Sequence, residues 1–285
     1  MKRIITVKEL QKHLKKLNIS PVGIVPTMGA LHDGHISLVR NATYRCPVVI
    51  VSIFVNPTQF NDREDLKNYP RTIEADLVLL KDHLRKDDVV FTPDDKEVYP
   101  VKDNRVFSFG NLDRVMEALH RPGHFNGVAQ VVSRLFDIVK PDIAFFGRKD
   151  FQQVAVIKSM VRQLKLKVRI IACPIVRESD GLAMSSRNRL LEKEIRKNAP
   201  VIYKTISKAA EMINTSEVPQ IKKFVESSIG KEDGFHVEYF EIVDDKDLIP
   251  VNKRSEMKKG RHYYGCIAVK AGKIRLIDNI EIPLM

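Results

Sequence analysis

The sequence predicts an α/β protein in which a doubly wound parallel sheet is followed by a smaller α+β domain. Short apolar runs such as 22–25 and 48–55 lack the polar alternation of a strand with one face in water, so helices must cover both faces. Helical patterns separate these runs with short connections, which is the order of βαβ units. Alternating strands and a hairpin near the carboxyl end indicate the second domain.

The elements of the first domain follow in a regular order. Apolar residues recur at helical intervals over 6–17, and Thr6 followed three residues later by Glu9 predicts a capped start. The patterns then predict a strand at 22–25, a helix at 36–45, a strand at 48–55, a polar loop at 61–69, a helix at 72–85, a strand at 88–91, a mobile substrate-covering loop at 121–127, a helix over 128–138, a strand at 142–146, a helix after Asp150 and a strand at 167–173.

The character of the chain changes beyond Pro174. Residues 176–188 are polar and predicted as a loop. Two helices, a strand and a hairpin follow, at 192–213, 218–228, 235–243 and 266–277. We therefore divide the chain into a domain of residues 1–175 and a second domain of residues 176–285.

The net charge of +12 indicates an anionic partner. Lysines are spread along the predicted helical stretches 8–16 and 193–208 and are interleaved with acidic residues. The interleaving of aromatic and basic residues that is typical of single-strand binders is missing from the sequence. The charge pattern therefore favours an anionic small molecule, such as a nucleotide, over nucleic acid.

Cysteine usage and hydropathy indicate the compartment. Cys46, Cys173 and Cys266 are odd in number, far apart and in no CxxC spacing, which argues against a disulfide framework and a structural zinc. The sequence also lacks a signal-peptide core and an apolar run of about 18 residues. We expect a cytoplasmic protein without a membrane-spanning segment.

Segment 22–35 is the leading candidate for a ligand site, because a strand breaks there at a proline and a helix follows. Free N–H groups at a helix start favour an anion, and Gly29 and Gly34 allow the backbone to approach it closely. His32 and His35 share one face if the helix has begun, so both can reach one phosphate chain. Taken alone, the two histidines are equally typical of a loop or of half a zinc shell.

Two further segments add cationic and hydroxyl groups. Lys149 follows the strand 142–146, and residues 185–187 form a Ser-Ser-Arg sequence in the interdomain loop. A nucleoside triphosphate is the simplest ligand for all three segments, because donors aimed at its α-phosphate stabilise charge during in-line attack. Singly, Lys149 is also consistent with a surface lysine, and the serines and Asp150 with helix caps.

Several motifs together resemble one enzyme family. Residues 26–35, Pro-Thr-Met-Gly-Ala-Leu-His-Asp-Gly-His, resemble the HxGH signature of the nucleotidylyl-transferase superfamily, and Met-Ser-Ser-Arg-Asn at 184–188 is similar to its second, mobile signature. With residues 54–60, 121–125 and 146–153, the order and spacing resemble the pantothenate synthetase family, the pantoate-β-alanine ligases of coenzyme A biosynthesis. HxGH alone indicates only the superfamily.

The resemblance implies a Rossmann-like fold, a homodimer and a two-step, ATP-dependent amide synthesis. The carboxylate of pantoate attacks the α-phosphate of ATP, and magnesium-bound pyrophosphate leaves. The amine of β-alanine then attacks the pantoyl-adenylate, which yields pantothenate and AMP. The second domain is expected to act as a lid over the active site.

The resemblance also implies roles for individual residues. Those implied for catalysis are His35, His32 and Lys149. Those implied for ATP are Met28, Gly29, Ala30, Leu31, His32, Asp33, Gly34, His35, Gly147, Arg148, Lys149, Asp150, Val176, Met184, Ser185, Ser186 and Arg187. Those implied for pantoate or β-alanine are Gln59, Gln153, Arg121 and His124. The resemblance implies a proton donor at His35. We expect His35 to act instead as an electrostatic stabiliser, because the first step requires no proton transfer.

Some features depart from this pattern or leave alternatives. Arg148 stands where many members of the family have glutamate, so only its backbone is expected to serve. Asp76 is a weak candidate for a magnesium ligand.

Two other functions remain open: a transferase that leaves the nucleotide on its product, and an RNA-binding protein that uses the basic surface. Release of AMP separates the first from a ligase, and salt-dependent filter binding tests the second.

Overall fold

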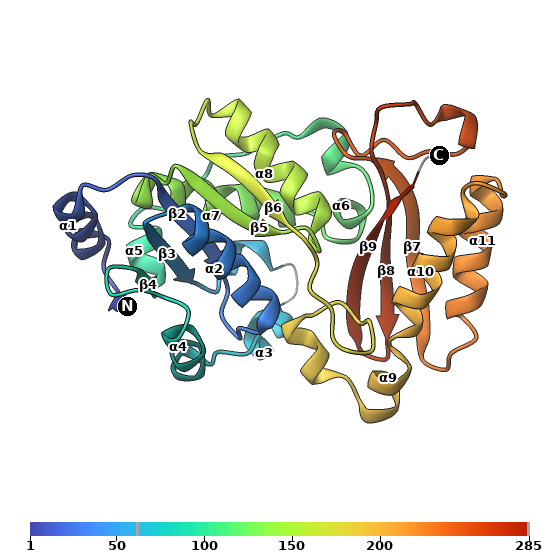
Figure 1. Ribbon diagram of the computed structural model, residues 1–285, viewed down its shortest axis with the longest axis horizontal. Coiled ribbons are helices and arrows are strands. Elements are labelled where there is room, and N and C mark those ends of the chain that lie inside the picture. The colour runs from blue at the N-terminus through green and yellow to red at the C-terminus, as the bar shows by residue number, and fades with distance from the viewer. Residues whose placement is uncertain (61–62, 284–285) are drawn as a thin grey trace.

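The computed structural model describes residues 1–60 and 63–283. Six parallel strands form one sheet in the order β1-β4-β3-β2-β5-β6 (Figure 1). The strands are β1 (Lys2–Ile4), β2 (Val22–Thr27), β3 (Val48–Ile53), β4 (Val89–Phe91), β5 (Ile143–Gly147) and β6 (Arg169–Cys173). The predicted doubly wound parallel sheet is therefore confirmed.

A second, antiparallel sheet lies at the other end of the molecule (Figure 1). Its strands, in the order β7-β8-β9, are β7 (Phe235–Asp244), β8 (Tyr263–Ala271) and β9 (Ile274–Ile282). Two helices, α10 (Val201–Met212) and α11 (Val218–Ile229), pack against it around a core of their own. The smaller α+β part predicted from the sequence is present.

The remaining helices connect or flank the strands. They are α1 (Val7–Leu17), α2 (Asp33–Arg45), α3 (Arg63–Asn68), α4 (Ile73–Lys81), α5 (Asp95–Val98), α6 (Glu117–His120), α7 (His124–Val139), α8 (Phe151–Gln163) and α9 (Lys193–Asn198), with 3-10 turns η1 (Pro57–Gln59), η2 (Gly110–Asp113), η3 (Ser186–Leu190) and η4 (Arg254–Glu256). Thr6 caps α1 by accepting a hydrogen bond from the Glu9 amide, as predicted.

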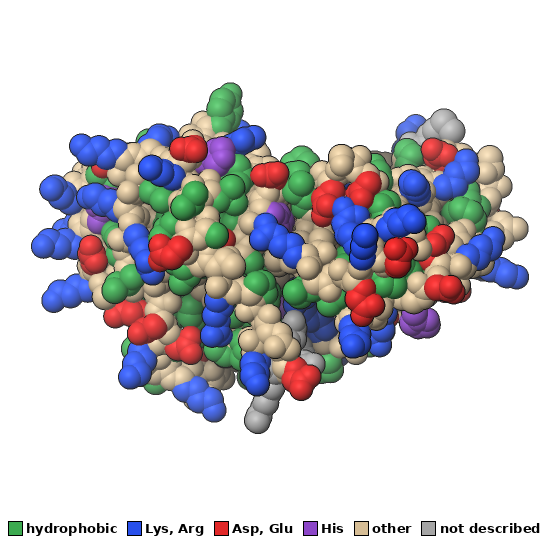
Figure 2. Space-filling view, turned by 90° about the horizontal axis from the view of Figure 1, so that it is seen from below, with side chains coloured by type: hydrophobic (Ala, Val, Ile, Leu, Met, Phe, Trp, Pro, Cys, Tyr) green, Lys and Arg blue, Asp and Glu red, His purple; other side chains and the backbone are tan. Residues whose placement is uncertain are grey.

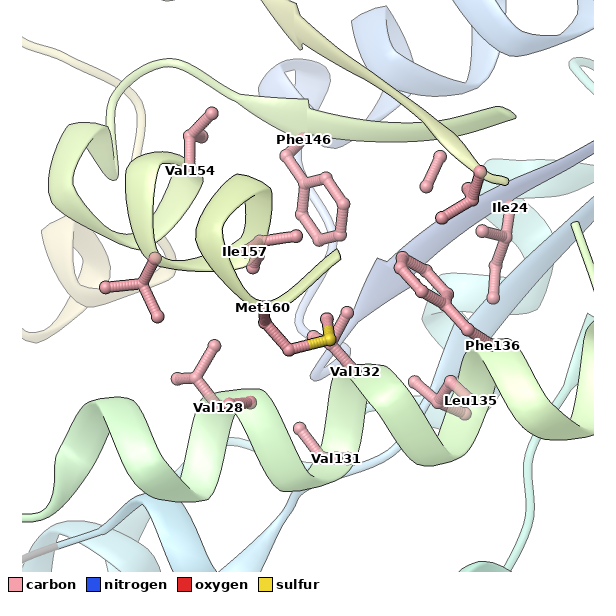
Figure 3. Packing of buried hydrophobic residues seen from close by; sticks show 14 of the residues in the cluster. Ile24, Val128, Val131, Val132, Leu135, Phe136, Phe146, Val154, Ile157 and Met160 are labelled. Atoms are coloured by element: carbon pink, nitrogen blue, oxygen red, sulfur yellow. The ribbon is translucent and has the colours of Figure 1, made fainter. Parts of the chain in front are cut away.

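Both faces of the parallel sheet are covered, which explains its apolar strands. Every residue of β3 is buried. Val49 and Val51 pack with α2 and α4, whereas Val48 and Ile50 belong to the core on the opposite face, with α1, α7 and α8. On that face the apolar side of α7, including Val128 and Leu135, points toward the residues of α8 and β5 (Figure 3).

The two parts of the chain share some of their packing. Val243 and Leu248, together with Tyr264 and Cys266 of β8, belong to the same buried cluster as α7 and α8. One face of the second sheet therefore packs on the core of the first part, while α10 and α11 cover its other face. This contact fixes β9 beside the carboxyl end of β5, where Asn279 donates hydrogen bonds to the chain just after the strand.

Several element boundaries differ from the prediction. Helix α2 begins at Asp33 rather than Ile36, and the predicted helix 192–213 is divided at Pro200, which caps α10. The strand β1 was not predicted, because two of its three residues are the basic Lys2 and Arg3, so it shows no apolar run. In the polar stretch 61–69, residues 61–62 lie outside the described residues, and the loop prediction is wrong for Arg63–Asn68, which forms α3.

The predicted mobile loop at 121–127 is also wrong over its second half. His124 begins α7, and both His124 and Phe125 are buried. The glycine before them adopts a left-handed φ of 80° and turns the chain into the helix. Packing of this first helical turn against η1 overrides the turn propensity of the sequence.

The distribution of surface charge and the length of the helices are relevant to binding of nucleic acid and to crossing of a membrane. On the face drawn in Figure 2, Lys and Arg side chains are spread widely and acidic side chains lie between them. Within the described ranges, no helix has the length and apolar character needed to cross a membrane.

Candidate active site

The sheet topology places one crevice at the carboxyl ends of β2 and β5. Strand β2 lies between β3 and β5, and the chain builds the sheet outward from β2 in both directions, so ligands are expected at this switch point. A cleft opens there, at the kind of position where small-molecule sites of α/β sheets are usually found. Of the predicted site residues, those lining it are Met28, His32, Gly34, His35, Gln59, Gly147, Lys149, Asp150, Gln153, Val176, Met184, Ser185, Ser186 and Arg187.

His32 and His35 cap the start of α2 with their own side chains. The Gly34 amide donates to His32 Nδ1 at 3.1 Å, and the His32 amide donates to His35 Nδ1 at a longer 3.4 Å. The ring centroids are 4.1 Å apart. Since Nδ1 is an acceptor in each ring, a neutral imidazole carries its proton on Nε2.

Burial keeps both rings neutral. Burial is the largest cause that lowers the pKa of His32 to about 4 and that of His35 to about 3. The Lys149 ammonium lowers both pKa values further, and the two rings are close enough for His32 to lower the pKa of His35. The pair therefore offers neutral N–H donors at a helix N-terminus near neutral pH.

Lys149 supplies the positive charge of the cleft. It lies in the turn between β5 and α8, and its side chain is about one-fifth exposed. Its Nζ is 3.6 Å from the carboxylate of Asp150, the residue that precedes α8. Gly147, at the end of β5, has open space where a Cβ would be, so a ligand can approach its backbone.

Asp76 holds the loop that precedes His32 by accepting hydrogen bonds from its backbone. Its two carboxylate oxygens accept from the amides of Ala30 and Leu31 at 3.0 and 2.8 Å, and from Thr72 Oγ1 at 3.2 Å. The side chain is 3% exposed and faces a separate hollow. Asp76 is therefore a loop-positioning residue, and its geometry lends no support to the magnesium candidate of the sequence analysis.

The part of the cleft wall that contains Gln59 is positioned by a close contact between η1 and α7. Gln59 is buried, and its Nε2 lies 2.6 Å from Met28 Sδ. Its backbone carbonyl accepts from His124 at 2.8 Å. Burial is the main cause that lowers the pKa of His124 to about 4. The ring is therefore a neutral donor, and its hydrogen bond to the Gln59 carbonyl holds η1 in place.

A smaller hollow of about 410 Å³ adjoins the cleft and shares its lining residues Lys149, Asp150 and Gln153. Arg121 and His124, which the sequence analysis assigned to substrate, line this hollow rather than the main cleft. The shared residues make the two spaces neighbours. The larger cleft and the smaller hollow therefore form one continuous region around Lys149, Asp150 and Gln153.

The polar segment 176–188 is an ordered turn rather than an open loop. Arg177 pairs with Ala183 in an antiparallel bridge, and the Met184 amide donates to the Val176 carbonyl at 3.0 Å. Ser185 then caps η3 by accepting from the Arg187 amide. This turn brings Val176, Met184 and residues 185–187 to the cleft, with Met184 close to Gly34 of the histidine segment.

Some predicted residues lie beside the cleft rather than in its lining. Among the described residues, Gly29, Ala30, Leu31 and Asp33 are outside that set, and the first three form the loop that Asp76 holds. The guanidinium of Arg148 lies over the Tyr264 ring, 5.5 Å from its centroid. Its side chain therefore does not serve the cleft, as expected.

Sequence reasoning assigned no role to two residues of this region. Asn56 is buried in the cleft wall, where it accepts from Tyr99 and donates to the Gly127 carbonyl. Its position directly after an apolar strand could have indicated a role at the cleft, because ligand sites lie at the carboxyl ends of parallel strands. Asn279, which contacts the Lys149 turn, lies 130 residues away in the chain and gave no such signal.

These observations define a class of protein: an α/β protein with a parallel sheet whose switch point carries a cleft between a histidine-capped helix and a lysine turn, a geometry suited to an anionic ligand. A comparison with family models matches residues 2–281 to the family described as pantoate-beta-alanine ligase. The chain belongs to the pantoate-beta-alanine ligase family.

Individual relatives agree with this assignment. The chain is 50% identical over 283 residues to a pantothenate synthetase of Bacteroides thetaiotaomicron, and the match covers 99% of each chain. The crystal structure of pantothenate synthetase from Thermus thermophilus superposes with a TM-score of 0.91 at 40% identity over 100% of both chains. The ligase of Francisella tularensis, complexed with beta-gamma ATP and beta-alanine, has a TM-score of 0.78 at 33% identity and covers 100% of this chain and 99% of its own.

The reaction follows from the family. The enzyme joins the carboxylate of pantoate to the amine of β-alanine.

Proposed function

We propose that this condensation takes place at the switch-point cleft in two steps, driven by ATP. The pantoate carboxylate attacks the α-phosphate, the bond to pyrophosphate breaks, and a pantoyl-adenylate forms. The amine of β-alanine then attacks the acyl carbon, loses a proton to solvent and displaces AMP. The observation that carries this proposal is the convergence of His32, His35 and Lys149 on one cleft. The Francisella relative crystallised with beta-gamma ATP and beta-alanine supports ATP and β-alanine as ligands.

The three catalytic residues act on the phosphates. The Nε2–H groups of His32 and His35 donate hydrogen bonds to phosphate oxygens, and Lys149 balances the charge that develops at the α-phosphate. Because both rings are neutral, they act as positioned dipoles rather than as acids. Ser185, Ser186 and Arg187 also bind the phosphates.

The other cleft residues bind the remaining parts of the substrates. Gly147 and Asp150 hold the ribose, while Val176 and Met184 line the adenine side. Gln59 and Gln153 bind pantoate, because amides can pair with both its hydroxyls and its carboxylate. Arg121 and His124 line the neighbouring hollow, which suits the second substrate.

Further features of the family belong to the same proposal. Magnesium enters with ATP: such ions are usually bound by nucleotide phosphates with one or two carboxylates, so a dedicated protein cage is not needed. The described residues contain no group of three or more candidate metal ligands. We also expect a cytoplasmic homodimer, and a domain of residues 176–285 that closes as a lid over residues 1–175.

Replacement of Lys149 by alanine tests the catalytic assignment. We expect Lys149→Ala and His32→Ala each to remove about 3 to 4 kcal/mol of transition-state stabilisation, since each acts as a positioned donor. Pantoate-dependent exchange of pyrophosphate into ATP measures this first step separately from the second.

Lys158→Ala is the matched control, because Lys158 is an exposed lysine on the helix that follows Lys149. It should leave the exchange rate unchanged. An exchange rate of Lys149→Ala close to that of the unmodified enzyme would falsify the role of Lys149. The complete reaction, with β-alanine added, should release AMP; a stable adenylylated product would instead indicate a transferase.

A further inference from the structure

Two adjacent residues of β9, Asp278 and Asn279, contact two segments that contribute to the cleft, the Lys149 turn and the turn that precedes Ser185. They are 4% and 3% exposed, although β9 belongs to the second sheet. Both also line the smaller hollow that adjoins the cleft. Their hydrogen bonds go to two separate segments, the Lys149 turn and the turn that contains Arg177.

Asn279 holds the lysine turn. Its Nδ2 donates to the backbone carbonyls of Arg148 and Lys149 at 2.9 and 3.0 Å. These carbonyls precede α8 and lie outside its hydrogen-bond ladder, so a buried donor must satisfy them. A side-chain amide has two N–H groups on one nitrogen, which is what two consecutive carbonyls require. On the other side of the turn, the Arg148 amide donates to the Cys173 carbonyl at 2.8 Å, so the turn is held from both sides.

Asp278 holds the turn that precedes Ser185. Its carboxylate accepts from both terminal nitrogens of Arg177 at 2.6 and 3.0 Å, the bidentate geometry of the strongest ion pairs. Arg177 also donates to the Gly181 carbonyl at 3.2 Å, and its guanidinium stacks 3.7 Å from the centroid of the Tyr203 ring. The turn that leads into Ser185 is therefore fixed to β9.

The two contacts are joined through the strand. Asp278 Oδ1 also accepts from the backbone N–H of Asn279 at 2.8 Å, so one carboxylate is bonded both to Arg177 and to the strand at Asn279. A shift of β9 would move the lysine turn and the serine-arginine segment together.

We propose that Asp278 and Asn279 set the distance between the two phosphate-binding segments, and that Asn279 is a positioning residue for Lys149. The inference rests on the proposed role of Lys149 in adenylate formation. It assigns to the second sheet a direct part in the first chemical step, because misplacement of a catalytic group by about 1 Å can cost roughly 100-fold in rate.

Removal of the amide tests the proposal. Asn279→Ala should lower the maximal rate of pantoate-dependent ATP–pyrophosphate exchange roughly 10- to 100-fold. Asn279→Asp, nearly the same in shape, should be at least as impaired, since a carboxylate would face two carbonyl oxygens without a donor. In a Lys149→Ala background, Asn279→Ala should cause little further loss, because a residue that acts through Lys149 is not additive with it.

Asn111 provides a matched control. Its Nδ2 also donates to two consecutive carbonyls, those of Asp247 and Leu248, at 2.9 and 3.1 Å, but on a more exposed part of the surface. Asn111→Ala should leave the exchange rate within about twofold of the unmodified enzyme, as expected for a surface change away from the chemistry. If Asn279→Ala fails to fold, Asn279→Ser, which keeps one donor, is measured in its place and should be intermediate.

The outcomes separate this inference from the role of Lys149 itself. A full exchange rate in Lys149→Ala overturns the catalytic assignment. A strong loss in Lys149→Ala, with Asn279→Ala or its serine replacement no more impaired than Asn111→Ala, overturns the positioning role alone. Equal losses from Asn279→Ala in the presence and absence of Lys149 also contradict it, since they indicate a general structural effect.

Discussion

At the scale of single residues, the hydrogen bonds and the burial of His32 and His35 determine which ring nitrogens carry protons. Each Nδ1 accepts a backbone N–H, which leaves Nε2–H as the donor, and burial holds both rings neutral. The histidine motif is thus a pair of neutral dipoles, with Lys149 as the neighbouring cation. This distinction leads to two predictions about residues of α2.

The first concerns pH and stability. The pKa values of His32 and His35 fall from 6.5 in the unfolded chain to about 4 and about 3 in the fold. Below pH 6.5 the unfolded chain binds more protons than the native state, so stability is full above pH 6.5 and is lost as pH falls toward 4. Each histidine should contribute a slope of about 1.4 kcal/mol per pH unit in this window.

Urea unfolding between pH 7 and pH 4.5 measures this slope. His35→Asn should flatten it by one proton equivalent, because asparagine does not titrate. A slope that is identical in the variant and the unmodified protein would show that His35 is not responsible.

The second prediction concerns Gly34. A Cβ there would lie 2.8 Å from Cε1 and Nδ1 of the His32 ring, so Gly34→Ala must displace that ring from its cap. Alanine is normally favoured over glycine in a helix by about 1 kcal/mol, and a flexible side chain can move away. We therefore expect stability close to that of the unmodified protein, but at least about tenfold slower ATP–pyrophosphate exchange. Thermal unfolding and the exchange assay together check this; unchanged exchange would mean that the position of the ring does not matter.

At the scale of elements, the site depends on how closely α7 approaches η1. Gly127 of α7 leaves no room for a side chain: a Cβ would lie 2.3 Å from the Thr58 carbonyl oxygen and 2.8 Å from the Cα of Gln59. The contact is reinforced by Asn56, which donates to the Gly127 carbonyl, and by His124, which bonds the Gln59 carbonyl. The side of the cleft that we propose for pantoate is thus built by two elements in van der Waals contact.

Gly127→Ala should push η1 away from α7. Overpacking of this kind costs about 1–3 kcal/mol in stability, and the displacement of Gln59 should raise the KM for pantoate more than the KM for ATP. Steady-state kinetics with each substrate varied in turn provide the measurement. Equal changes in both KM values would argue against a local effect on the pantoate side.

At the scale of the whole molecule, a buried ion-pair network fixes the second sheet to the first part of the chain. Arg275 of β9 donates to both oxygens of Glu117 at 2.7 Å and to Glu238 at 2.6 Å, and Tyr239 donates to Glu117 at 2.7 Å. Glu117 is 7% exposed. Hydrogen bonds and the charge of Arg275 keep the pKa of Glu117 below its ordinary value, even though burial opposes them.

Removal of one partner should leave a buried charge without its pair. We expect Glu117→Ala to lower the free energy of unfolding by about 3–5 kcal/mol, and the double variant with Arg275→Ala to cost less than the sum of the two single changes. Urea unfolding of the four proteins measures the coupling.

Glu211→Ala, which breaks the exposed pair between Lys208 and Glu211, is the control and should cost at most about 1 kcal/mol. If the losses from Glu117→Ala and Arg275→Ala were simply additive, the network would not act as a unit.

The sequence was most informative where local patterns and function coincide. The apolar strands predicted a parallel sheet because they carry no polar alternation, and Thr6 with Glu9 predicted the first helix cap that the structure contains. Boundaries were least accurate where tertiary contacts override local propensity. His124 lies in a turn-rich sequence but begins a helix, because its ring and first turn pack on η1.

By itself, the sequence determined the parallel sheet, the histidine and serine-arginine segments and the family, because each of these is encoded by neighbouring residues or by the order of motifs. Only the tertiary structure decided the neutral state of the histidines, the supporting role of Asp76 and the link from Asn279 to the Lys149 turn. Burial, and hydrogen bonds between residues 45 to 130 positions apart, depend on the completed fold and leave no local pattern in the chain.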